Sequence, residues 1–250
     1  MIVIKNKISI GKMEEAGKRL SSIFETVDGQ AIEGKSTLTV DAWIEAQLAK
    51  LGLESRTKGY RSYRHASCIS INNELVHGIP SEKKMIKSGD IVKIDICASW
   101  RGYCADMARM VIVGKVPSKV SDFVDVAQQS LDAGIAQAVA GGRLSNISAA
   151  IQQKIEEHGY GVVRDFAGHG IGKRMHEEPE ILNYGHPGQG PLLREGMTFA
   201  IEPMLTMGSY EVDVMDDGWT VKTRDGNLAG HIEDTVLITD GMPKILTRPH

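Results

Sequence analysis

Apolar residues recur every three or four positions in four segments of the chain, and short apolar runs typical of strands lie between them. The helical period predicts helices over residues 11–27, 39–51, 120–135 and 145–155. The short apolar runs predict strands over residues 68–71, 91–98, 103–113, 160–164, 197–205 and 229–239. Each half of the chain therefore repeats the order helix, helix, strands.

This repeated order predicts a fold of the α+β class. The two halves, about residues 1–115 and 116–250, are expected to pack their sheets together, with the helices outside and a cleft at the seam. No linker rich in Pro or Ser separates the halves, so we expect a single domain over residues 1–250. A chain of 250 residues with 42% hydrophobic residues is long enough to bury a substantial core.

Two strand runs flank Ser99–Gly102, a segment with the length of a hairpin loop. A turn centred there places Asp95 and Asp106 directly opposite each other, with Cβ atoms about 4.5–5.5 Å apart. If both side chains face solvent, the pair needs no further explanation. If they are buried, they repel each other and lose hydration, so they either share a proton or hold a cation between them. Cys97 and Cys104 lie on the same face, which favours the buried pair.

Composition argues against several classes of function. The formal net charge of −3 provides no basic field for nucleic acid. The three cysteines are odd in number and lack zinc-knuckle spacing, so we expect free thiols in a reducing compartment. No run of about 18 apolar residues occurs. Residues 1–10 are too short and too charged for a signal peptide, and a cytoplasmic protein is expected.

Four polar residues of the second half lie within segments otherwise suited to burial or close packing. His169 lies between glycines, His176 follows seven residues later, and Glu202 and Glu233 interrupt apolar runs. Taken singly, each has an ordinary explanation as a structural hydrogen-bonding residue or a solvent-facing side chain. Taken with the two hairpin aspartates, they would be a costly set of buried charges. Four carboxylates and the imidazole of His169 suit two divalent cations about 3.5–4 Å apart, with Mn, Fe or Co favoured over a structural zinc.

The same residues belong to an ordered series of short motifs. The series is His77-Gly-Ile-Pro80, Asp95 and Asp106, Gly168-His-Gly-Ile-Gly172, His176-Glu-Glu-Pro179, Glu202-Pro-Met204 and Ile232-Glu-Asp-Thr235. The series covers essentially the whole chain and resembles the type I methionine aminopeptidases of the creatinase-like "pita-bread" superfamily. The resemblance implies two pseudo-symmetric halves, with helices outside a curved antiparallel sheet.

The resemblance also implies a set of roles. The metal ligands would be Asp95, Asp106, His169, Glu202 and Glu233, with Asp106 and Glu233 bridging two ions of Co, Mn, Fe or Zn. A metal-bridging hydroxide would cleave the first peptide bond of chains that begin with Met, with Glu202 moving its proton. His176 would stabilise the oxyanion, and His77 would steer the second residue. The methionine pocket would comprise Tyr60, Tyr63, Cys68, Met175 and Trp219.

The implied substrates are the N-terminal peptides of nascent proteins in the cytoplasm, including those still at the ribosome. The implied enzyme is a monomer that requires neither nucleic acid nor a membrane. Three residues depart from the family pattern: Met107 replaces the usual Thr, His231 replaces Gln, and Asp234 replaces His. His231 shares strand parity with Glu233 and is expected to reach the site. Ile232-Glu-Asp-Thr235 also resembles the Xaa-Pro peptidases, so an Xaa-Pro exopeptidase is the alternative. A metal-free peptide-binding module is a second alternative.

Overall fold

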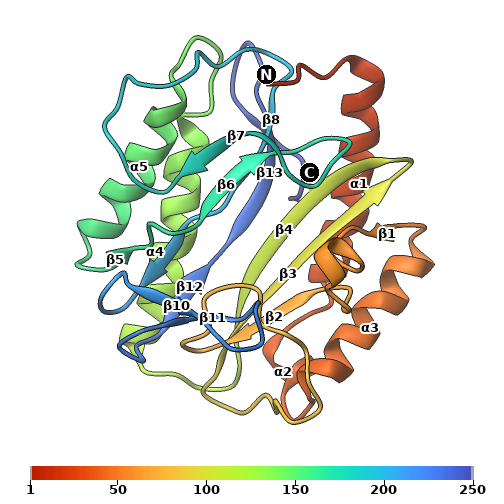
Figure 1. Ribbon diagram of the computed structural model, residues 1–250, viewed down its shortest axis with the longest axis vertical. Coiled ribbons are helices and arrows are strands. Elements are labelled where there is room, and N and C mark those ends of the chain that lie inside the picture. Colours follow the sequence, from red (N-terminus) through yellow and green to blue (C-terminus); the bar gives the residue numbers. More distant parts are fainter. Residues whose placement is uncertain (1, 249–250) are drawn as a thin grey trace.

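A long hairpin crosses the middle of the molecule in this computed structural model, which describes residues 2–248 (Figure 1). Its strands are β3 (Ile91–Trp100) and β4 (Tyr103–Ile112). The other strands of the main sheet extend from this hairpin in the order β1-β3-β4-β13-β8-β6-β7, with β2 also paired to β3 and β14 to β13. All of these pairings are antiparallel. The bounds are β1 Glu54–Ser55, β2 Cys68–Ile71, β6 Ala167–Gly170, β7 Glu177–Leu182, β8 Thr198–Ile201, β13 Glu233–Leu237 and β14 Lys244–Ile245.

The hairpin register differs from the sequence expectation. Trp100 pairs with Tyr103, so the loop is the two residues Arg101 and Gly102 rather than Ser99–Gly102. Both loop residues have positive φ, 48° and 78°, as a type I′ hairpin turn requires. Asp106 therefore lies opposite Cys97, and the expectation that it lies directly opposite Asp95 is wrong. The two aspartates are diagonal neighbours on one face, a spacing of about 7–8 Å between Cα atoms that leaves room for a cation between their side chains.

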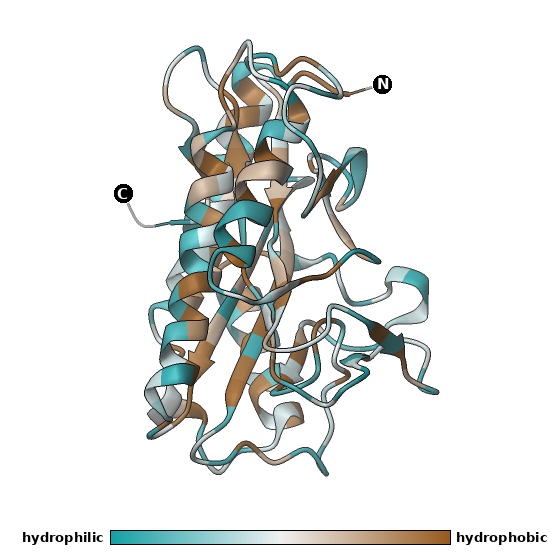
Figure 2. Cartoon of the chain, turned by 90° about the vertical axis from the view of Figure 1, so that its left-hand side faces the viewer, coloured by the Kyte–Doolittle hydropathy of each residue, from teal (hydrophilic) through white to brown (hydrophobic). Residues whose placement is uncertain are grey.

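Two pairs of long helices pack against the sheet, one pair from each half of the chain (Figure 1). Apolar residues of the helices meet those of the strands in two separate core clusters, one with α1 and α3 and one with α4 and α5. Figure 2 shows largely apolar strands, and helices that carry polar and apolar residues on different faces. The bounds are α1 Lys7–Phe24, α2 Gly29–Ile32, α3 Thr37–Lys50, α4 Ser118–Ala136 and α5 Leu144–Glu156, with a short 3-10 turn at Tyr60–Ser62.

Local capping explains why the first two long helices begin earlier than the apolar period indicates. The side chain of Asn6 accepts a hydrogen bond from the backbone N–H of Ser9 at 3.0 Å, which starts α1. Ser36 Oγ accepts from the N–H of Thr39 at 3.1 Å, so Ser36 is the N-cap of α3 and Thr39 lies inside the helix. Apolar periodicity identifies the buried face of a helix but not the residue that ends it.

Two smaller sheets complete the fold. One has the order β12-β9-β5, and the other pairs β10 with β11. The bounds are β5 Gly161–Val162, β9 Met204–Thr206, β10 Val212–Val214, β11 Val221–Thr223 and β12 Ala229–His231. Because β9 follows β8 and β12 precedes β13 after one or two residues, the small sheet begins where the main sheet ends. Within residues 2–248, no helix is both long enough and apolar enough to cross a membrane.

Candidate metal centre

Four of the five predicted ligands lie within strands of the main sheet, and the fifth, Glu202, directly follows another. Across the order β3-β4-β13-β8-β6 these residues are Asp95, Asp106, Glu233, Glu202 and His169, with Glu202 directly after the end of β8. All five line one cavity of about 730 Å³. The seam between the halves runs through this group, because β13 pairs with β4 in the register Glu233 to Ala108.

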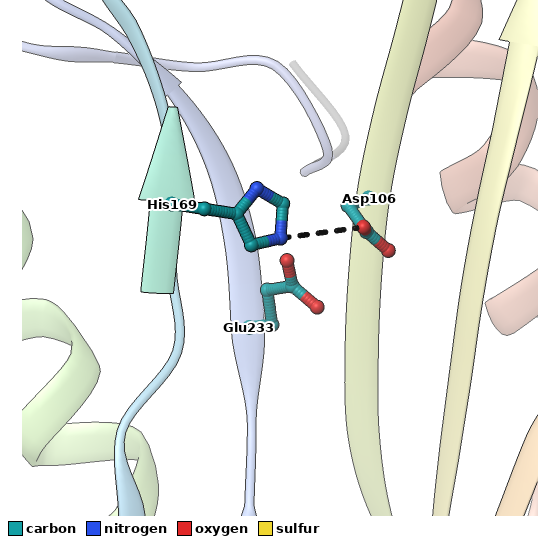
Figure 3. Close-up of side chains that lie close together, drawn as sticks. All are labelled: Asp106, His169 and Glu233. Carbon is teal, nitrogen blue, oxygen red and sulfur yellow. Dashed lines mark ion pairs between the residues drawn. The ribbon is translucent and has the colours of Figure 1, made fainter. Parts of the chain in front are cut away.

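The side chains converge closely. His169 Nε2 lies 3.9 Å from Asp106 Oδ2 and 3.6 Å from Glu202 Oε1. Figure 3 shows Asp106, His169 and Glu233 pointing toward one another from three strands. In this group of three, one ligand atom from each residue lies within 4.8 Å of the other two. Glu202, His231 and Glu233 form a second group of the same kind, so Glu233 belongs to both.

The glycines beside His169 hold its strand close to both neighbours. A Cβ at Gly168 would lie 2.5 Å from the carbonyl oxygen of Ala200, and one at Gly170 would lie 2.0 Å from that of Glu178. Neither position tolerates a side chain, and this explains the Gly-His-Gly sequence. The imidazole Nδ1 lies 3.0 Å from the Gly170 carbonyl oxygen. A hydrogen bond there places the proton on Nδ1 and leaves Nε2 free to bind a metal.

Without a cation, the cluster suppresses its own ionisation. Burial, then the Asp106 carboxylate, raise the pKa of Asp95 to about 8. Burial, then Glu202, raise the pKa of Asp106 to about 7, and burial raises the pKa of Glu202 to about 8. Burial, then Asp106, also raise the pKa of Glu233 well above its usual range. Burial lowers the pKa of His169 to about 3, so its imidazole is neutral.

Two buried carboxylate oxygens, Asp106 Oδ1 and Glu233 Oε1, have no hydrogen-bond partner within the described part of the chain. Buried polar atoms are normally paired, and an unpaired carboxylate oxygen beside other carboxylates is best satisfied by a cation. The donor set of carboxylates and a neutral imidazole fits divalent metals such as Mn, Fe, Co or Zn. The residues present therefore fit a metal centre.

His77 and His176 line the same cavity. The His77 ring packs edge-on against Phe166 and Trp219, at centroid distances of 5.7 and 6.1 Å, and burial lowers its pKa to about 4. His176 Nδ1 lies 3.1 Å from the Tyr60 hydroxyl, and its ring is 4.4 Å from that of His169. Both histidines are thus held by aromatic neighbours at the cavity wall.

The residues predicted for the methionine pocket also line the cavity. These are Tyr60, Tyr63, Cys68, Met175 and Trp219. The single O–H of Tyr63 is shared between the carbonyl oxygens of Ser67 and Gly78, at 3.1 and 3.3 Å, so the tyrosine ring forms a fixed wall. Trp219 packs edge-on against that ring at 4.9 Å. Sequence reasoning missed Phe166, whose position three residues before His169 was the available indication.

The three departures from the family pattern lie on opposite sides of the sheet. His231 lines the cavity, in agreement with its strand parity. Met107 faces away, into the core packed against α1 and α3. Asp234 is fully buried opposite Met107, where it accepts from Arg109 Nη2 and Arg248 Nε at 2.6 Å each. Met107 and Asp234 therefore lie behind the metal centre, on the face of the main sheet that points away from the cavity.

The raised carboxyl pKa values predict how the metal-free protein responds to pH. A carboxyl group whose pKa is higher in the folded than in the unfolded chain stabilises the fold at low pH, and this contribution is lost as pH rises through the folded pKa. Asp106, Asp95 and Glu202 have pKa values of about 7, 8 and 8 in the folded protein and of about 4 in an unfolded chain, so the loss accumulates from about pH 4 to about pH 8. Below about pH 6.5 it is partly offset, because the imidazole of His169 is neutral in the folded protein but becomes protonated in the unfolded chain. We therefore expect the Tm of EDTA-treated protein to fall by several degrees between about pH 6.5 and 8.

Thermal unfolding at both pH values, with and without added Mn²⁺, measures this effect. Metal binding requires ionised carboxylates, so added Mn²⁺ should raise Tm more at the higher pH. A metal-free Tm that rises over this interval would contradict the proposed like-charge cluster.

The curved antiparallel sheet, its outer helices and the carboxylate-lined cavity define the pita-bread class of metal-dependent enzymes. A family model for metallopeptidase family M24 matches residues 11–240. A methionine aminopeptidase of Clostridium acetobutylicum is 43% identical over 247 residues, which cover 99% of each chain. The chain belongs to metallopeptidase family M24, and it is therefore a metallopeptidase-family protein with a divalent-metal centre.

Solved structures distinguish two branches of the same fold. The crystal structure of a methionine aminopeptidase from Thermotoga maritima has a TM-score of 0.97 and 41% identity, and the match covers 100% of both chains. The prolidase of Pyrococcus furiosus has a TM-score of 0.77 and 27% identity, and the match covers 99% of this chain but 66% of the prolidase. Similarity in length, sequence and backbone is thus greater to the methionine aminopeptidase.

Proposed function

We propose that this protein removes the N-terminal methionine of polypeptides by metal-dependent hydrolysis. The observation that supports this most strongly is the convergence of four carboxylates and a neutral imidazole at one cavity that also has an aromatic and sulfur-containing wall. The full-length similarity to methionine aminopeptidases agrees with it. The cavity takes residues from both halves, which supports a single catalytic domain.

Two divalent ions are proposed, held by Asp95, Asp106, His169, Glu202 and Glu233. Glu233 is the best candidate for a shared ligand because its carboxylate lies within 4.8 Å of donor atoms of Asp106, His169 and Glu202. Asp106 is proposed as the second shared ligand, since it lies between Asp95 and Glu233 in the sheet order. When bound, such ions polarise the scissile carbonyl and lower the pKa of water that attacks it.

The protein's own groups handle protons and orientation. Glu202 is proposed to take the proton of the attacking water and pass it to the leaving amine. A Tyr60 hydroxyl that donates to His176 Nδ1 places the imidazole proton on Nε2, where it can be donated to the developing oxyanion. His77, between Phe166 and Trp219, is proposed to orient the backbone of the second substrate residue. Met175, Cys68 and the aromatic wall would accept the flexible methionine side chain.

Assays of the metal-loaded protein on Met-Ala-Ser and Ala-Pro peptides test the proposal. We expect cleavage of the first and negligible cleavage of the second. The Xaa-Pro exopeptidase is the alternative because the Ile232-Glu-Asp-Thr235 run resembles those peptidases and the prolidase of Pyrococcus furiosus has a similar fold. Preference for Ala-Pro would establish that alternative. Peptide binding without any metal-dependent turnover would establish the non-catalytic module.

Replacement of His77 by Ala is expected to lower kcat/KM for Met-Ala-Ser by roughly 10²-fold, because a positioned polar contact to the substrate is lost. Its side chain belongs to neither close group of metal donors, so metal content should be unchanged. Elemental analysis of the dialysed variant, alongside kinetics, measures both quantities. Loss of metal together with activity would assign His77 to the metal centre instead.

The remaining proposals concern the cellular setting. We propose a cytoplasmic enzyme that needs neither nucleic acid nor a membrane, and the net charge of −3 provides no basic field for nucleic acid. Its substrates would be the N-terminal peptides of nascent proteins, met near the ribosome. Cys68, Cys97 and Cys104 are free thiols, in keeping with a reducing compartment. A monomer is proposed, and sedimentation measures it.

A further inference from the structure

His231 occupies a buried position beside the metal centre, although none of the proposed catalytic steps uses it. It ends β12, opposite Met204 of β9, and only 2% of the residue is exposed. Its Nε2 lies 3.1 Å from Glu202 Oε2, a hydrogen-bond distance. A buried imidazole at this distance from a catalytic carboxylate is placed to control that carboxylate.

Glu202 needs such control because it lies outside the regular strands. It falls between β8 and β9, immediately before Pro203, so the ladder of the main sheet does not hold it. Two contacts do. Its backbone carbonyl oxygen accepts from Asn183 Nδ2 at 3.1 Å, and Asn183 is itself 1% exposed. Its side chain is held through Oε2 by His231, while Oε1 lies 3.6 Å from His169 Nε2.

The direction of the His231–Glu202 hydrogen bond follows from the chemistry of the carboxylate. A glutamate that binds a metal is ionised and can only accept hydrogen bonds. The hydrogen between the two side chains must then belong to His231 Nε2, and a nitrogen that carries this proton cannot also bind a metal. Proximity to Glu202 and Glu233 is therefore not sufficient to make His231 a ligand through Nε2.

We propose that His231 is a positioning residue: its Nε2–H holds Oε2 of Glu202 and turns Oε1 toward His169 and the metal centre. This inference rests on the proposed function only in taking Glu202 as a metal ligand. It also agrees with the departure noted in the sequence, where His231 replaces the Gln of the family pattern. A glutamine side chain can present an amide N–H to the same oxygen, but it is a poor substitute for an imidazole as a metal ligand.

Two substitutions at this position separate positioning from ligation. H231L keeps an apolar side chain in the buried site but has no donor, and we expect it to weaken Mn²⁺ binding and lower kcat/KM by about 10–100-fold. H231Q restores a donor, and we expect both quantities to stay within about threefold of wild type. H158Q is the matched control at an exposed histidine. Calorimetric titration of EDTA-treated full-length protein with Mn²⁺ gives the affinity without reference to turnover.

A double-mutant cycle with E202A tests whether His231 acts through Glu202. If it does, H231L should change Mn²⁺ affinity by less than about twofold once Glu202 is absent. Equal losses in H231Q and H231L, or an undiminished loss in the E202A background, would overturn the inference. Wild-type affinity in H231L would overturn it too. Failure of the wild-type protein to bind Mn²⁺ at all would instead contradict the proposed function. Because H231Q conserves side-chain length and polarity, it keeps the comparison decisive even if H231L folds poorly.

Discussion

Replacement of Asp106 by Asn is expected to lower kcat/KM for a Met-Ala-Ser peptide by roughly three orders of magnitude or more. Asp106 Oδ2 lies 3.9 Å from His169 Nε2, the residue is 5% exposed, and its Oδ1 has no hydrogen-bond partner among residues 2–248. The amide has nearly the same shape but lacks the charge that holds a cation between the strands. Metal content after dialysis, measured together with kinetics, should show the loss of bound ion.

The same substitution should stabilise the metal-free fold, because it removes one member of a like-charge cluster. We expect the Tm of metal-free Asp106→Asn to equal or exceed that of the wild type at about pH 8. D216N, a change at an exposed aspartate, is the control and should alter neither activity nor Tm. Full metal content and activity in Asp106→Asn would remove Asp106 from the metal centre.

Replacement of Asp234 by Ala is expected to lower the free energy of unfolding by about 3 kcal/mol. Its side chain is fully buried and accepts from Arg109, Arg248 and the Thr247 hydroxyl. Removing it leaves two guanidinium groups without their buried partner. Both are partly exposed, at 20% and 30%, so solvent offsets some of the cost and the estimate lies at the lower end of the range for broken buried pairs.

Chemical denaturation measures this loss, and hydrogen exchange should show faster opening of the segment around Thr247. Because Arg109 Nη1 also donates to the Glu233 backbone carbonyl oxygen at 2.6 Å, metal affinity should fall as well. D213A breaks an exposed aspartate–arginine pair and serves as the control, with an unchanged midpoint expected. Equal midpoints for D234A and D213A would show that the buried network contributes nothing to stability.

The sequence predicted most of the elements that carry the site, because the buried face of a helix or strand requires apolar residues at regular intervals along the chain. Helices α1, α3, α4 and α5 fall within a few residues of the expected ranges. Strands β6 and β7 were not predicted: Gly168 and Gly170 resemble a loop in sequence, and only the close approach of the neighbouring backbones requires glycine there. The turn at Arg101–Gly102 was missed for a similar reason, since an arginine at positive φ is unusual.

The candidate site shows the same division. Residue types and their sequence surroundings sufficed to select the five proposed ligands and His176, and the family resemblance added His77 and the pocket wall. All of these residues line one cavity. The sequence identified His231 only as a departure from the family pattern. Its contact with Glu202 depends on how the small sheet meets the main sheet. The sequence did not single out Phe166 or Asn183. Their roles, packing against a ring and donating one hydrogen bond, can be filled by several residue types, so neither residue type marks the position as functional.

The sequence by itself determined the family, the fold class and the set of charged residues that no ordinary core accommodates. Each of these depends on residue types and on their spacing, which can be read without knowing the tertiary structure. The tertiary structure alone decided the register of the central hairpin, the buried Asp234–Arg109–Arg248 network behind the sheet, and which atom of Glu202 faces which histidine. Those features arise where segments distant in the chain meet. Their free energy depends on distances of a few tenths of an ångström, which a linear pattern does not record.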